Sequence, residues 1–136
     1  MSQPRVVALA EVHVHSRPRG PAEFLPKDFS NVVRLADTMV WNPAVDGILW
    51  GESRQDESGS HGGERHLDAD EVLYLISGAF RLSLELDDGH VEIPVTAGQA
   101  VIVPQGTWHR LIIDEPCHYL FFGGGRTELR IDKSKS

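Results

Sequence analysis

The chain has 136 residues, enough for one domain with one hydrophobic core but not for two domains of ordinary size. Hydrophobic residues make up 40% of it and charged residues 24%, a balance that excludes wholesale disorder. Thirteen basic and twenty acidic residues give a formal net charge of -7, which argues against nucleic acid and anionic membranes as partners.

Cysteine usage bears on the compartment. Cys117 is the single cysteine, so the chain forms neither an internal disulfide nor a cysteine-based zinc site. No segment approaches the roughly 18 apolar residues of a membrane span, and the first ten residues make a poor signal peptide. We therefore expect a cytoplasmic protein without a membrane partner, in which Cys117 is a small buried side chain.

The N-terminal third carries weak signals for regular structure. Residues 13–15, His-Val-His, are predicted to form a strand or an arm, with no glutamate at the spacing of a metal site. The prolines and glycine in residues 16–26 argue against any regular element there. Residues 31–38 are compatible with a short helix, capped by Ser30 or Asn31.

Strand signals dominate from residue 39 onward. Apolar residues alternate with polar ones along 80–86 and 91–95, on either side of the turn dipeptide Asp88-Gly89. Further strands are predicted at 45–54, 71–76, 101–103, 111–113 and 118–122. Many short strands with little helix indicate an all-β sandwich or barrel, and the pattern alone does not decide between the two.

Two groups of residues have the chemistry of a metal site. Glu64 and His66 are two residues apart, so on a strand both side chains project from the same face. Glu71 opens the next predicted strand, and His109 follows a Pro-x-Gly turn that can direct it into the same cavity. Imidazole and carboxylate groups together suit one divalent transition metal such as Fe, Mn, Ni, Cu or Zn.

The spacing of these residues resembles that of the cupin superfamily. The second cupin motif is a glycine, five residues, Pro-x-Gly, two residues and a histidine, and it is complete at Gly98, Pro104, Gly106 and His109. The first motif is partial: Glu71 and Gly78 are separated by six residues, and His66 matches the second histidine. The likeness covers residues 64–109 by motif and about 48–122 by strand pattern.

One position departs from the family pattern. Glu64 stands where the first motif has its first histidine. Three alternatives follow for this ligand position. Glu64 is a carboxylate ligand there, or His61 enters from the neighbouring loop in its place, or the position is empty and metal binding is weak. The parity of Glu64 with His66 favours the first alternative, and a surface ion pair of Glu64 with Arg65 or Arg54 is the non-functional one.

The resemblance implies a cupin double-stranded β-helix, which is a jelly-roll barrel, usually paired into a homodimer with one metal ion inside each barrel. We expect an N-terminal arm at 1–40 that packs on the barrel or on the partner, the barrel at 41–125 and a C-terminal tail at 126–136. The expected metal ligands are Glu64, His66, Glu71 and His109.

Three functions are compatible with this site. The first is a metal-dependent enzyme, most simply an oxygenase acting on a small organic molecule, because two histidines and a carboxylate suit Fe(II) and O₂ chemistry. In it, Glu71 or Glu64 would act as the catalytic base. The second is a non-redox isomerase, epimerase, lyase or cyclase. The third is a small-ligand-binding protein without catalysis.

Overall fold

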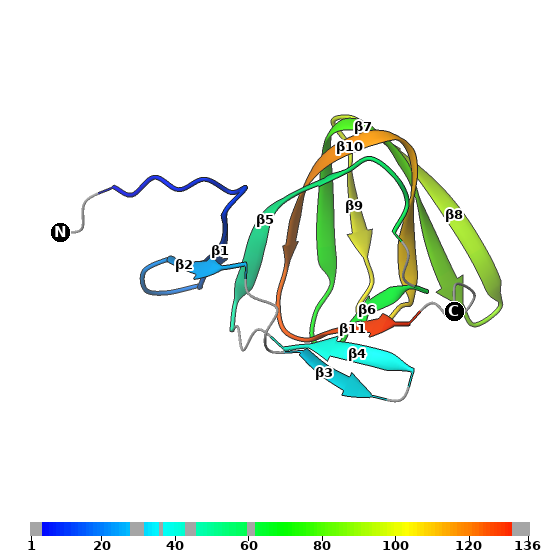
Figure 1. Ribbon diagram of the computed structural model, residues 1–136, viewed down its shortest axis with the longest axis horizontal. Helices are drawn as coiled ribbons and strands as arrows, with labels where there is room; N and C mark the ends of the chain where they lie inside the picture. The colour runs from blue at the N-terminus through cyan, green and yellow to red at the C-terminus, as the bar shows by residue number, and fades with distance from the viewer. Residues whose placement is uncertain (1–3, 28–31, 36, 43–45, 60–61, 132–136) are drawn as a thin grey trace.

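The computed structural model describes residues 4–27, 32–35, 37–42, 46–59 and 62–131 (Figure 1). Every regular element in these ranges is a β-strand, and the strands pair in antiparallel fashion. This confirms the predicted all-β class. Within the same ranges, no helix has the length and hydropathy of a membrane span. The strands are β1 (Val12–Ser16), β2 (Glu23–Pro26), β3 (Val32–Leu35), β4 (Thr38–Trp41), β5 (Ile48–Gln55), β6 (Glu64–His66), β7 (Glu71–Leu86), β8 (Gly89–Thr96), β9 (Ala100–Val103), β10 (His109–Gly123) and β11 (Thr127–Arg130).

The strands form one curled sheet. Its main path runs β2-β1-β5-β10-β6-β11-β4-β3, and β7 pairs with β10, β8 and β9. In Figure 1, β5, β7, β8, β9 and β10 stand side by side as the curved wall of a barrel, and β6, β11 and β4 lie across its lower end. The short strands at the lower end include the one that carries Glu64 and His66.

The two longest strands, β7 and β10, replace pairs of shorter strands predicted from the sequence. Both bend over the top of the barrel in Figure 1. Within β7, Gly78 has a φ of +94°. A Cβ atom at this position would lie 2.1 Å from the carbonyl oxygen of Pro116 on β10. Glycine is therefore needed here both for its backbone conformation and for the close approach of the two strands.

The hydrophobic core lies inside the curled wall. Phe80 and Leu82 on β7 are almost completely buried, and Cys117 on β10 is 4% exposed. The Cys117 thiol donates to the carbonyl oxygens of Glu115 and Ala79, and burial raises the pKa of this thiol. The prediction that Cys117 is a small buried residue is confirmed. The buried cluster consists of Leu73, Leu75, Phe80, Leu82, Leu84, Val95, Val103 and Cys117.

Two expectations for the N-terminal third are wrong. Residues 16–26 contain β2, which pairs with β1 at the edge of the sheet, where a proline is tolerated because one side of the strand needs no donor. The helix expected at 31–38 is replaced by the hairpin of β3 and β4, in which Val33 pairs with Val40. The proposed cap residues Ser30 and Asn31 lie outside the described residues.

Candidate metal centre

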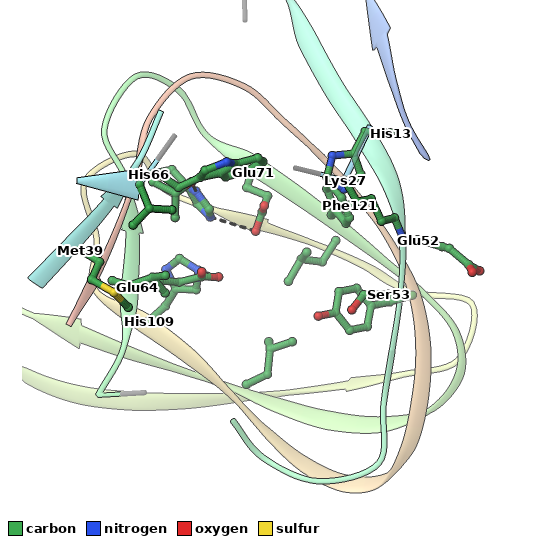
Figure 2. Close-up of a pocket in the computed structure, with 17 residues that line it drawn as sticks. His13, Lys27, Met39, Glu52, Ser53, Glu64, His66, Glu71, His109 and Phe121 are labelled. Carbon is green, nitrogen blue, oxygen red and sulfur yellow. Dashed lines mark hydrogen bonds and ion pairs between the residues drawn. The ribbon is translucent and has the colours of Figure 1, made fainter. Parts of the chain in front are cut away.

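Four side chains with metal-ligating atoms meet at the lower end of the barrel. They are Glu64 and His66 on β6, Glu71 at the start of β7 and His109 at the start of β10, and their ligand atoms all lie within 4.8 Å of one another (Figure 2). These are the four residues selected from the sequence.

Strand register explains how residues so far apart in sequence meet. Glu64 pairs directly with His109 across β6 and β10. His66 is two residues further along β6, so its side chain leaves from the same face as that of Glu64. The turn before His109 is tied to the same strand, because the backbone N–H of Gly106 donates to the carbonyl oxygen of His66. Gly106 has a φ of +77°, which the turn requires.

Each histidine is held through its Nδ1 atom. Nδ1–H of His109 donates to the carbonyl oxygen of Thr107 at 2.9 Å, and Nδ1 of His66 lies 3.0 Å from Oγ1 of Thr127 on β11. The Nε2 atoms therefore face the carboxylates. Nε2 of His66 lies 3.0 Å from Oε1 of Glu71, and Nε2 of His109 lies 3.4 Å from Oε1 of Glu64. In metal-binding histidines, one ring nitrogen usually forms a hydrogen bond to the protein while the other binds the metal.

The burial of the two Nε2 atoms tests whether these residues fit a metal. His66 and His109 are 8% and 3% exposed, and neither Nε2 has a well-directed hydrogen-bond partner among the described residues. Buried polar atoms without such a partner are rare and call for an explanation. Two ligand atoms that bind one first-row ion at about 2.1 Å lie no more than about 4.2 Å apart, so small movements would close this cluster around an ion. The residues fit a divalent metal with two nitrogen and two oxygen ligands.

The carboxylates also control the charge of His66. Burial lowers the pKa of His66, but the interaction with Glu71 and the charges of Glu71 and Glu64 outweigh it, so the pKa of His66 is raised above its usual value. Without a metal, the cluster is thus a set of acidic groups that attracts positive charge.

Glu64 lies in the cluster rather than in a surface ion pair with its neighbour. Arg65 projects from the opposite face of β6, where its guanidinium lies 3.1 Å from Glu128 and stacks over the ring of Trp108. The side chain of Glu64 is 30% exposed and reaches His109. This supports the first alternative for the ligand position. His61, the competing residue, lies outside the described residues.

A pocket of about 510 Å³ opens beside the cluster, a volume in the range of small-molecule sites. Its walls are largely apolar, and residues from β4, β5, β10 and β11 contribute to it. Sequence reasoning identified only the ligand cluster. The other lining residues are His13, Lys27, Val32, Met39, Trp41, Glu52, Ser53, Leu73, Leu111, Tyr119, Phe121, Thr127 and Leu129.

Tyr119 supplies a polar group to the pocket wall. It pairs with Ser53 across β10 and β5, and its hydroxyl donates to Oε1 of Gln55 at 3.2 Å. Burial, reinforced by the nearby charges of Glu64 and Glu71, raises the pKa of Tyr119 to about 12. Tyr119 therefore stays protonated at neutral pH. Because its one proton is donated to Gln55, its oxygen can accept a hydrogen bond from a bound molecule.

The family comparison agrees with this geometry. The family model of the cupin domain, Cupin_2, matches residues 54–123, which is more than half of the chain. The chain belongs to the cupin family. The matched range of this cupin contains the four clustered residues and the strands that carry them. No match was found among curated proteins.

Solved structures share the fold of this cupin at low sequence identity. A variant of oxalate decarboxylase OxdC from Bacillus subtilis aligns with 17% identity and a TM-score of 0.52, over 70% of this chain and 29% of that one. A cupin-2 domain protein from Shewanella frigidimarina aligns with 18% identity and a TM-score of 0.47, over 56% of this chain and 69% of that one. A hydroquinone 1,2-dioxygenase from a Sphingomonas species aligns with 18% identity and a TM-score of 0.46, over 57% and 60%. The alignment with oxalate decarboxylase shows a shared fold. This cupin spans less than a third of the oxalate decarboxylase chain.

Proposed function

We propose that this cupin is a metal-dependent enzyme of the oxygenase type that acts on a small organic molecule. One observation carries the proposal: two buried imidazole Nε2 atoms and two carboxylates converge on the wall of a pocket large enough for a substrate. Two histidines with a carboxylate are the ligand set of many non-haem Fe(II) oxygenases.

All four residues would hold the metal, and one of them has a second role. His66, His109 and Glu71 are the three whose side chains are largely buried at the cluster. An Fe(II) ion bound there supplies redox and Lewis-acid chemistry. Glu64 is the most exposed of the four, so its carboxylate is the best placed to take a proton from a substrate in the pocket.

The pocket wall positions the substrate and limits water. Leu73, Leu111 and Phe121 present apolar surface next to the cluster. An apolar surrounding strengthens the interactions of the few polar groups within it. The oxygen of the Tyr119 hydroxyl, whose proton is donated to Gln55, is then a hydrogen-bond acceptor for a polar group of the substrate.

Oxygen uptake tests the proposal. The protein is loaded in turn with Fe(II), Mn(II) and Zn(II) and screened with a set of small organic acids, phenols and diketones. We expect substrate-dependent O₂ consumption with Fe(II) only, and its loss in His109→Ala but not in the surface control His90→Ala. Oxygen consumption that persists in His109→Ala would contradict the assignment of the site.

A second candidate is a non-redox isomerase, epimerase, lyase or cyclase. Glu64 and Tyr119 line the same pocket, which favours this class. A carboxylate can take a proton from a substrate and a protonated phenol can give one. Turnover with Zn(II) or Mn(II) in the absence of O₂ would identify this class. Saturable ligand binding without turnover under any condition would identify a binding protein instead.

We further propose that the protein is a homodimer. Tyr74 and Ile76 on β7 are 38% and 41% exposed, and Ile102 on the neighbouring β9 is 64% exposed. Such an apolar sheet face is commonly covered in assemblies. Sedimentation analysis should give twice the chain mass for the wild type and a monomer for Ile102→Asp. A wild-type monomer would contradict the proposal.

We propose a cytoplasmic location, without nucleic acid or membranes as partners. The net charge of -7 disfavours both kinds of partner, and the lone thiol of Cys117 fits a reducing compartment. Fractionation of cells that express the tagged protein should place it with cytoplasmic markers. Recovery from the membrane or secreted fraction would contradict the proposal.

A further inference from the structure

The pocket contains a cation that the ligand cluster does not use. Lys27 follows β2 and lines the pocket together with His13 of β1. In Figure 2, Lys27 and His13 lie on the side of the pocket away from Glu64 and His109. The N-terminal segment therefore supplies polar side chains to the end of the pocket that lies away from Glu64 and His109.

Lys27 is the charged group at this end. Burial and the neighbouring charge of Lys27 lower the pKa of His13, so this histidine is neutral at pH 7. No residue in the described ranges forms an ion pair with Lys27. The nearby carboxylate of Glu52 points away from the pocket (Figure 2) and pairs with His118.

The ligand cluster does not supply a competing positive charge. When Glu64 and Glu71 both face a divalent ion, their two negative charges balance that ion. Lys27 then leaves the pocket with a net positive charge at the end away from Glu64 and His109. A cation in a largely apolar pocket favours a bound anion more strongly than it would in water.

Most of the remaining pocket lining is apolar. The apolar side chains offer contact to a ring or a short alkyl chain and provide no further charge. They include Met39, Trp41, Leu73, Leu111, Phe121 and Leu129. The volume of about 510 Å³ fits a molecule with one ring or a short chain.

We infer that the substrate of this cupin is a small organic acid with an apolar body, whose anionic group binds Lys27 while its reactive end faces the ligand cluster. Lys27 is a specificity-determining residue in this account. The inference rests on the proposed function, because the reactive end is assigned from the metal site. Its binding part can still be tested separately.

A matched pair of probes tests the role of Lys27. Phenylacetate and phenylacetamide have nearly the same shape and differ in charge. Their binding is measured in the presence of saturating Zn(II), so that the ion balances the charges of Glu64 and Glu71, and is followed by tryptophan fluorescence, since Trp41 lines the pocket. We expect the wild type to bind the carboxylate about tenfold or more tightly than the amide. Lys27→Gln should abolish this preference, and Lys27→Arg should keep most of it.

A control variant separates local from general charge effects. Arg34→Gln removes one positive charge from an exposed position on β3 and should leave the preference unchanged. An equal affinity of the wild type for both probes, no binding of phenylacetate, or an unchanged preference in Lys27→Gln would overturn the inference.

Metal uptake separates this inference from the proposed function. Lys27→Gln should take up Zn(II) with the wild-type stoichiometry and affinity, because Lys27 is outside the ligand cluster. If the wild type takes up no metal but distinguishes the two probes through Lys27, the proposed function fails and anion recognition stands. If metal uptake is normal and the probe preference is absent, anion recognition by Lys27 fails and the metal site of the proposed function stands.

Discussion

Thr127 on β11 lies in register opposite His66 on β6, and its hydroxyl lies 3.0 Å from Nδ1 of that histidine. The contact fixes the plane of the imidazole, so that Nε2 faces Glu71. A residue near the end of the chain thus orients a ligand that lies more than sixty positions earlier. The metal site consequently depends on the pairing of β6 with β11 as well as on the four ligands.

Removal of the Thr127 hydroxyl should weaken metal binding. Thr127→Val keeps the shape of the side chain but loses the contact with His66, and a lost partner of this kind lowers metal affinity by about 10–100-fold. Titration calorimetry with Zn(II) measures the change. Thr127→Ser, which keeps a hydroxyl, is the control and should stay close to the wild type. Equal affinities for the valine and serine variants would show that Thr127 does not orient His66.

Substitution of Glu64 tests its place in the ligand set. Glu64→His restores the histidine of the cupin motif and should keep or strengthen Zn(II) binding. Glu64→Gln removes the charge at nearly constant size and should weaken binding by about tenfold or more. Calorimetry on both variants gives the comparison. Loss of the metal in Glu64→His would mean that Glu64 does not occupy the ligand position.

Gly78→Ala should destabilise the barrel strongly. The new Cβ would lie 2.1 Å from the carbonyl oxygen of Pro116, and the backbone φ of +94° adds strain. We expect a loss of roughly 2 kcal/mol or more in the free energy of unfolding, measured by urea denaturation. Gly98→Ala is the matched control, with a φ of +89° and open space around its Cβ, and should lose only about 1 kcal/mol. Similar losses in the two variants would show that β7 and β10 are not tightly packed at Gly78.

Tyr119 should make stability fall at high pH. Its pKa of about 12 in the folded protein lies above the value of roughly 10 in an unfolded chain. The protonated form therefore favours folding, and this contribution is complete below pH ~10 and is lost as the pH rises toward 12. Absorbance titration of the metal-free protein should show a tyrosine that ionises near pH 12 and is missing in Tyr119→Phe. Identical titration curves for the two proteins would contradict the burial of this hydroxyl.

The ligand cluster was predictable because its residues follow strand geometry. The parity of Glu64 and His66, and the fixed spacing from Gly98 to His109, specify positions on strands and in one turn. Such local rules hold wherever the strands form. Register then brings Glu64 opposite His109, which no local rule states but the cupin motifs imply.

The remainder of the site depends on long-range pairing. Thr127 reaches His66 only through β11, a strand without a clear alternating pattern. Lys27 enters the pocket from a proline-rich segment whose strand β2 is stabilised by pairing with β1 rather than by its own propensity. The hairpin of β3 and β4 likewise forms where the sequence is compatible with a helix, because β4 pairs with β11. Tertiary contacts override weak local preferences in all three places.

The measurement that tests the account most directly is the metal content of the protein purified without added metal or chelator. Elemental analysis should find about one equivalent of a first-row divalent metal in the wild type and in the surface control His90→Ala. His109→Ala should contain none and keep the circular dichroism spectrum of a β protein, since only a ligand is lost. Metal content that is unchanged in His109→Ala, or a wild type that holds no metal and takes none up on reconstitution, would contradict the metal centre on which the proposed function rests.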